Sequence, residues 1–265
     1  MTHRFFHGLR PTLHISHRGG SGLAPENTLP AFRQAVERYR TQVLELDVHM
    51  TSDGELVVAH DETVDRCTDG TGAIAKMKSA NLARLDAGFR FSPDGKQFPF
   101  RGKGARIPTL LEVLRAFQEM RLNIEVKPGV KGLETAFAEL LRAEKAVNRV
   151  CVGSESDLVA AKVFEALPEG CHFYPRDALA AFVISVKTGA PPPIDERFTV
   201  LDMPLEYQGM RLYDPQLRDA ALKHGRWINV WTIDDPAEMR RLVDQGVGGI
   251  MTDRPDLLRE VLGES

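Results

Sequence analysis

The chain has 265 residues, of which 43% are hydrophobic and 27% are charged, and its formal net charge is -3. This is the composition of an ordinary globular protein, and the slight negative charge does not favour nucleic acid or an anionic membrane surface as a general partner. No run of apolar residues approaches the roughly 18 that a transmembrane helix needs, so we expect no membrane insertion. Three cysteines without metal or redox spacing, and an N-terminus without a long apolar core, predict a reduced, cytoplasmic protein.

The first predicted strand, 13–17, ends in the pair His17 and Arg18. A glycine-rich loop follows, and its glycines allow close backbone approach. Residues 25–40 then carry apolar side chains at helical spacing, which predicts a helix. Two side chains that can carry positive charge at the end of a strand indicate that they face an anion.

The second predicted strand, 43–48, alternates apolar and acidic residues. Because alternate residues of a strand share a face, its leucines and valine point one way, and Glu45, Asp47 and the following His49 point the other way. In a barrel the apolar face packs under helices, which places both carboxylates inside. Two buried, unpaired carboxylates are costly, and a divalent cation with hard oxygen ligands would relieve the conflict.

After the second strand, VVAHD places His60 directly before a long segment, 61–108. This segment is too long for an ordinary loop and is rich in turn residues, and long insertions in compact folds are usually functional or disordered. We expect the insertion to cap the active-site face. The four phenylalanines of the stretch 89–100 within it are candidates for an exposed apolar rim.

The third main strand, 122–126, repeats the alternation of the second. Glu125 and Lys127 are predicted to face inward beside Glu45 and Asp47. Three carboxylates from two neighbouring strands indicate a site for Mg²⁺ or Ca²⁺, and the absence of cysteine ligands argues against zinc.

The remaining chain continues to alternate short strands with helices. Strands are predicted at 13–17, 43–48, 122–126, 149–153, 171–174, 198–202, 227–231 and 249–252. Caps at Thr109, Asp214 and Asp235 begin helices between them. Eight strand-helix units predict one domain over 1–265, an α/β (β/α)8 TIM barrel with an insertion after the second strand. An open, doubly wound sheet is the alternative. The sequence argues against it, because no G-x-G-x-x-G motif follows the first strand.

Two histidines, two fixed cations and a metal suit a phosphate ester. Arg18 and Lys127 can bind non-bridging oxygens, a metal can polarise the phosphorus, and His17 and His60 can serve as base and acid. The simpler interpretation is structural: Arg18 would pair with Glu26, and the carboxylates would form salt bridges without a metal.

Several separated motifs occur in one order: HRG followed by PENT, then ELDV, TSDGELVVAHD, IEVKP, VWTID and GIMTDRPD. Together they resemble the glycerophosphodiester phosphodiesterase family over nearly the whole chain, from His14 to about Pro255. The resemblance implies a TIM barrel that hydrolyses a small-molecule glycerophosphodiester to glycerol 3-phosphate and an alcohol with a divalent metal. It also implies a cyclic phosphate intermediate, formed by the neighbouring glycerol hydroxyl and then hydrolysed. The region 155–207 matches weakly, which leaves the alcohol open.

The resemblance assigns a role to each matching position. His17 and His60 are implied as the acid-base pair, Glu45, Asp47 and Glu125 as metal ligands, and Arg18, Lys127 and Trp231 as substrate-binding residues. Glu26 and Asn27 are expected to orient His17 or its loop. Two other functions remain: phospholipase-like or cyclising action on a lipid phosphodiester, which needs an apolar rim, and a silent phosphate-binding barrel, which needs a lost catalytic residue.

Overall fold

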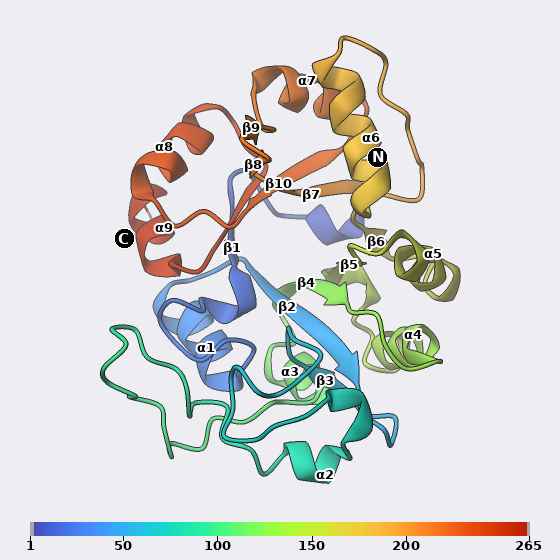
Figure 1. Ribbon diagram of the computed structural model, residues 1–265. Coiled ribbons are helices and arrows are strands. Elements are labelled where there is room, and N and C mark those ends of the chain that lie inside the picture. Colours follow the sequence, from blue (N-terminus) through green and yellow to red (C-terminus); the bar gives the residue numbers. More distant parts are fainter. Residues whose placement is uncertain (1–2, 264–265) are drawn as a thin grey trace.

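The computed structural model describes residues 3–263, and a ring of parallel strands surrounded by helices forms its centre (Figure 1). The ring contains β1 Leu13–Ser16, β2 Val43–Met50, β4 Arg121–Val126, β5 Val150–Gly153, β6 Cys171–His172, β7 Val200–Pro204, β10 Trp227–Trp231 and β11 Gly249–Thr252. Neighbouring strands follow the order β6-β5-β4-β2-β1-β11-β10-β7. A parallel bridge between Phe173 and Val200 joins the two ends of this order. The predicted TIM barrel is therefore confirmed.

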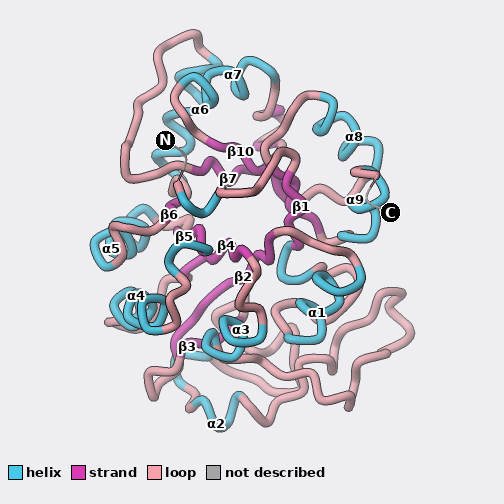
Figure 2. Tube along the Cα trace, turned by 180° about the vertical axis from the view of Figure 1, so that it is seen from behind, coloured by secondary structure: helices cyan, strands magenta, loops and turns pink. Residues whose placement is uncertain are grey.

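Each barrel strand leads into a helix on the outside of the ring (Figure 2). The helices are α1 Leu29–Arg33, α2 Ser79–Leu82, α3 Leu110–Ala116, α4 Leu133–Ala143, α5 Asp157–Ala166, α6 Arg176–Lys187, α7 Pro215–Lys223, α8 Pro236–Asp244 and α9 Pro255–Val261. The short turns are η1 Arg4–Phe6, η2 His17–Gly19, η3 Gln34–Arg38, η4 Ile74–Lys76 and η5 Val147–Arg149. Between residues 3 and 263, no helix combines the length and apolarity needed to cross a membrane.

The predicted helix caps are confirmed. Thr109 and Glu112 form the capping box of α3, and the side chains of Asp214 and Asp235 accept hydrogen bonds from the first turns of α7 and α8. These bonds satisfy backbone N–H groups that have no partner inside a helix.

The predicted helix 25–40 is wrong at its start. Asn27 lies in the left-handed region with φ of +57°, and the Thr28 hydroxyl caps a helix that begins at Leu29. A residue with positive φ cannot continue a right-handed helix. The helix then widens into the π-turn η3.

Two hairpins extend the barrel. The strand β3, Leu56–Val58, pairs antiparallel with the end of β2 and carries the chain into the insertion. The strands β8, Glu206–Tyr207, and β9, Met210–Arg211, form a small hairpin directly after β7. Neither hairpin was predicted, because strands of two or three residues give no periodic signal.

The insertion 61–108 lies beside β3 and α1 (Figure 1). It has a small core of its own, in which Val64, Ile74 and Leu82 pack against Val57 of β3. That the insertion also caps the active-site face stays a prediction.

The alternation of β2 and β4 is confirmed. The apolar residues that point outward pack under the helices in one cluster, which contains Leu44, Leu46, Val48, Ile124 and Val126. Because the period of a strand is two, their neighbours face the barrel interior.

Candidate active site

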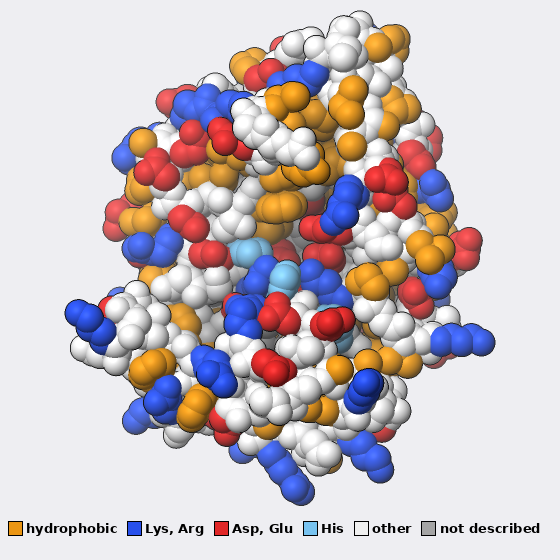
Figure 3. Space-filling view, viewed as in Figure 1, with side chains coloured by type: hydrophobic (Ala, Val, Ile, Leu, Met, Phe, Trp, Pro, Cys, Tyr) orange, Lys and Arg blue, Asp and Glu red, His pale blue; other side chains and the backbone are white. Residues whose placement is uncertain are grey.

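The predicted site residues lie on β2 and β4, just beyond the carboxyl ends of β1 and β4, and in the loop after β3, except Trp231, which ends β10. The space-filling view shows a hollow in this face in which histidine, basic and acidic side chains gather (Figure 3). Loops at the carboxyl ends of barrel strands form this face in enzymes with the same fold.

Glu45 and Asp47 lie inside the barrel and are 6% and 1% exposed. Burial, reinforced by the charge of Asp47, raises the pKa of Glu45 to about 8. Burial opposes ionisation of Asp47 as well, but Lys127 and Arg18 outweigh it and lower the pKa of Asp47. The two neighbouring carboxylates are therefore unequal: the ionised form is disfavoured at Glu45 and favoured at Asp47.

Lys127 bridges two of the predicted metal ligands. Its Nζ lies 3.0 Å from Asp47 Oδ1 and 2.7 Å from Glu125 Oε2. Asp47 and Glu125 are directly paired across β2 and β4, so the predicted juxtaposition of these carboxylates is present. Burial alone would lower the pKa of Lys127, but the two carboxylates raise it on balance.

His17 is held by a residue that the sequence did not single out. Its Nδ1 lies 2.7 Å from Asp253 Oδ1, just beyond β11, and its Nε2 lies 3.9 Å from Glu45 Oε2. Burial opposes protonation of His17, but Glu45 and Asp253 raise the pKa of His17 on balance. Asp253 stands in the motif GIMTDRPD, and its place after the last barrel strand was the signal available.

His60 is held in a similar way by its neighbour in the chain. The His60 Nδ1 lies 2.7 Å from Asp61 Oδ1, and the backbone carbonyl of His60 lies 3.1 Å from His49 Nε2. His49 therefore supports the loop of His60, which accounts for its place on the inward face of β2.

The loop after β1 folds tightly against the barrel. Arg18 has a φ of +51°, its backbone N–H donates to Glu45 Oε2 at 2.8 Å, and its Nη1 donates to Glu26 Oε1 at 3.1 Å. A Cβ on Gly20 would lie 2.7 Å from Pro255 Cγ, so the predicted close approach is present there. Asn27 Nδ2 donates to Asp47 Oδ2 at 2.9 Å. Glu26 and Asn27 thus position Arg18 and Asp47, and the contact to His17 comes from Asp253 instead.

Trp231 ends β10 and pairs with Pro204 of β7. It is partly buried against the apolar cluster inside the barrel. In the stretch 89–100, Phe91 packs edge-on against Phe100, and the Arg101 guanidinium lies over the rings of Phe98 and Phe89, at 3.8 and 4.3 Å from their centroids. Phe98 remains 38% exposed.

A polar network joins β4, β7 and β10 inside the barrel, and it was not predicted. Asp202 of β7 accepts hydrogen bonds from Asn123 Nδ2 of β4 at 2.6 Å and from Asn229 Nδ2 of β10 at 2.7 Å. Burial raises the pKa of Asp202 to about 6. The sequence predicted only that Asn123 faces inward, because the other two residues lie in strands without an obvious polar alternation.

The chemistry of this donor set suits a hard divalent cation. Glu45 and Asp47 are buried oxygen donors, and burial together with the charge of Asp47 disfavours the ionised form of Glu45, which a cation would stabilise. Within residues 3–263, however, no three His, Cys, Asp or Glu side chains converge closely enough to enclose a metal ion. Glu45, Asp47 and Glu125 fit a cation by charge and donor type, with the Lys127 ammonium neutralising two of them.

These features define a TIM-barrel enzyme with two carboxylate-bound histidines beside a cluster of carboxylates and cations. The sequence model of the Glycerophosphoryl diester phosphodiesterase family matches residues 17–257. The chain therefore belongs to this family, and it is a phosphoric diester hydrolase.

Individual relatives agree with this assignment. A glycerophosphodiester phosphodiesterase of Caldanaerobacter subterraneus subsp. tengcongensis is 33% identical over 258 residues, which cover 93% of this chain and 96% of that protein. Lysophospholipase D GDPD1 of Homo sapiens is 29% identical, with 94% of this chain and 85% of that protein covered. The structure of an Oleispira antarctica phosphodiesterase in complex with the product sn-glycerol-3-phosphate has a TM-score of 0.75 and 25% identity, and the match covers 97% of this chain and 99% of that one.

Proposed function

We propose that this enzyme hydrolyses a glycerophosphodiester to glycerol 3-phosphate and an alcohol, with a divalent cation held by Glu45, Asp47 and Glu125. The observation that carries the proposal is the pair of histidines, each bonded through Nδ1 to a carboxylate, beside these buried carboxylates. The bound product in the Oleispira antarctica structure supports the choice of substrate class.

His17 and His60 are the acid and the base in this proposal. A carboxylate can only accept a hydrogen bond, so a neutral imidazole beside it carries its proton on Nδ1 and offers the lone pair of Nε2 to the substrate. Two such groups can exchange roles between the formation of a cyclic phosphate and its hydrolysis.

Arg18 and Lys127 supply positive charge to the phosphate oxygens, and Trp231 contributes an apolar surface for the glycerol or the alcohol. The Lys127 ammonium also pairs with Asp47 and Glu125, which reduces the repulsion between these carboxylates and the phosphate. A bound divalent cation would polarise the phosphorus. Electrostatic stabilisation of developing charge is usually the largest contribution to catalysis in such a site.

A second candidate is hydrolysis of a lysophospholipid, as in the name of the human relative. The hairpin β8–β9 follows the carboxyl end of β7, and its side chains Tyr207 and Met210 are 62% and 59% exposed. Exposed apolar side chains beside the mouth of a barrel could accept an acyl chain.

The deciding experiment is release of glycerol 3-phosphate from glycerophosphocholine and glycerophosphoethanolamine, and of choline from lysophosphatidylcholine. The assay is run with EDTA, with Mg²⁺ or Ca²⁺ added back, and with H17A beside H7A, which removes an exposed histidine. We expect activity that a metal restores, that H17A loses and that H7A keeps. Turnover of lysophosphatidylcholine alone would select the second candidate. Activity that survives both EDTA and H17A would refute the proposed mechanism.

A further inference from the structure

Arg66, in the insertion, connects the two loops that carry the site. Its guanidinium holds Asp61 through Nε and Nη2, at 2.7 and 3.0 Å, and it holds Glu26 through Nη1 and Nη2, at 2.6 and 2.7 Å. Both contacts are bidentate, the strongest geometry for an arginine and a carboxylate.

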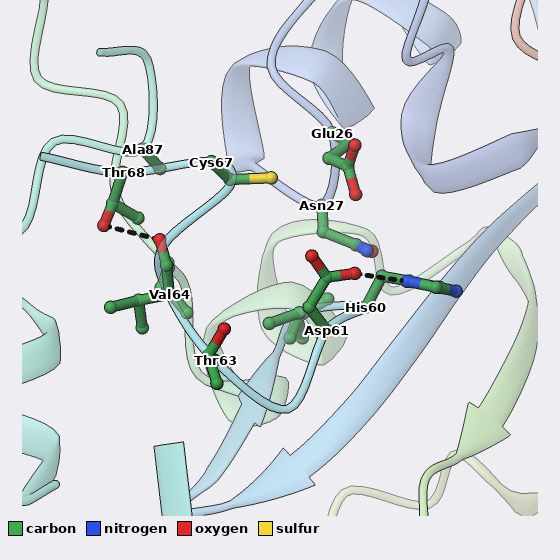
Figure 4. Close-up of a pocket in the computed structure, with 12 residues that line it drawn as sticks. Glu26, Asn27, His60, Asp61, Thr63, Val64, Cys67, Thr68 and Ala87 are labelled. Atoms are coloured by element: carbon green, nitrogen blue, oxygen red, sulfur yellow. Dashed lines mark hydrogen bonds and ion pairs between the residues drawn. The ribbon is translucent and has the colours of Figure 1, made fainter. Parts of the chain in front are cut away.

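Each of these carboxylates has a second partner in the candidate active site. Asp61 Oδ1 contacts His60 Nδ1, and Glu26 Oε1 accepts from Arg18 Nη1. The close-up shows Glu26 and Asp61 among the residues that line one small pocket, with Asp61 turned toward His60 (Figure 4). Arg66 thus completes a continuous chain of contacts from Arg18 to His60.

The positive charge of Arg66 offsets the negative charges of Glu26 and Asp61. Without it, Glu26 and Asp61 would be like charges around the same small pocket, and their repulsion would favour rotation of Asp61 away from His60. The His60 and Asp61 side chains are 34% and 30% exposed, so water can compete for the bond between them. The backbone contact from His49 holds only the loop, and leaves the ring of His60 free to turn.

We propose that Arg66 is a positioning residue: by clamping Asp61 against Glu26, it fixes the orientation and tautomer of the His60 imidazole and sets the loop of His60 relative to Arg18. The functional consequence rests on the proposed phosphodiesterase activity, whereas the positioning itself does not. The insertion would then contribute directly to the acid-base chemistry of the barrel.

The first test observes the imidazole without any substrate. In ¹H–¹⁵N NMR spectra of the neutral imidazole, the wild-type His60 signals should show the proton on Nδ1. R66M should shift these signals toward a mixture of the two tautomers and leave His17 unchanged. The matched control is R115M, which removes a similarly bidentate arginine that pairs with Glu144 in a more exposed position.

The second test is a double-mutant cycle on the rate of glycerophosphodiester hydrolysis. R66M should lower kcat by about 10- to 100-fold with little change in KM, because supporting residues of a catalytic group commonly contribute this much. In the H60A background the same substitution should change kcat by less than about 3-fold. R66K keeps the charge but not the fork and should lie between R66M and the wild type.

Three results would overturn the proposal: His60 signals that are the same in R66M and the wild type, an R66M effect no larger than that of R115M, or the full R66M effect in the H60A background. If R66M does not fold, R66K replaces it in both tests. A wild-type chain without activity on glycerophosphodiesters would refute the proposed function, and the NMR comparison would still decide the role of Arg66.

Discussion

The two histidines of the site are held by different parts of the molecule. His17 follows β1 and bonds to Asp253, which follows β11, and β1 and β11 pair along their whole length from Leu13 to Ser16. The Asp253 backbone N–H is in turn fixed by Asp234 Oδ1 at 2.8 Å. The position of this histidine is thus set by the barrel itself.

His60 has the same imidazole-carboxylate contact, but its support comes from the surface. Asp61 is its neighbour in the chain, and Arg66, whose side chain is 48% exposed, holds Asp61 in place. Pairs of exposed charges are individually weak and are screened by salt. One chemical arrangement can thus be built either from strand pairing or from a network of ion pairs, with different sensitivity to mutation and to solvent.

Removal of the imidazoles should have the largest effect. We expect H17A to lower kcat about 10³-fold and H60A about 10²-fold, within the range for a general acid or base. The difference follows from exposure, because the His17 side chain is 16% exposed and that of His60 is 34%, so water can replace His60 more easily. Steady-state hydrolysis of glycerophosphocholine measures both values, with H7A as the control. A larger loss in H60A than in H17A would contradict this ranking.

Removal of the carboxylate beside each histidine should lower the free energy of unfolding by different amounts at the two sites. Burial opposes ionisation of Asp253, but the contact with His17 lowers the pKa of Asp253 on balance. A lowered pKa in the folded state means that the stabilisation is present above the ordinary Asp pKa of about 3.9 and is lost as the pH falls through the folded value. We expect D253N to lower the free energy of unfolding by about 1–2 kcal/mol at pH 7, and D61N by less than about 1 kcal/mol because its partners are exposed.

Urea unfolding at pH 7 and at pH 3 tests this difference. The difference in the free energy of unfolding between the wild type and D253N should be smaller at pH 3. Protonation of Asp253 in the wild type then begins to remove the stabilisation that D253N lacks at pH 7. A gap that stays constant between the two pH values would mean that Asp253 stabilises the fold by packing, independently of its charge.

The sequence was sufficient for the parts of the site that depend on periodicity. Glu45, Asp47 and Glu125 were predicted to face inward because apolar residues alternate with them, and the packing of Leu44 and Leu46 under the helices confirms that alternation. The barrel followed from the repeated order of strands and helices in the same way.

The contacts that support the two histidines include pairs of residues that are far apart in the sequence, and no local sequence pattern predicts such contacts. Asp253 lies 236 residues from His17 in the chain, and Arg66 lies 40 residues from Glu26. The early start predicted for α1 failed for a related reason: the positive φ of Asn27 comes from the tight loop that brings its side chain to Asp47, and apolar spacing does not reveal it.

Salt should have the smallest effect on kcat, and it should distinguish the support of His60 from that of His17 most clearly. Raising the ionic strength from about 0.05 to 1 M shortens the Debye length from over 10 Å to about 3 Å, which weakens the contacts of Arg66 more than the buried contact of His17. We expect the ratio of kcat in the wild type to kcat in R66M to fall by about 2- to 3-fold over this range. Effects of salt on substrate and cation binding act on both proteins, so the ratio removes them. A ratio that does not change would mean that Arg66 holds Asp61 by its geometry in a site from which salt is excluded, and His60 would then be as firmly supported as His17.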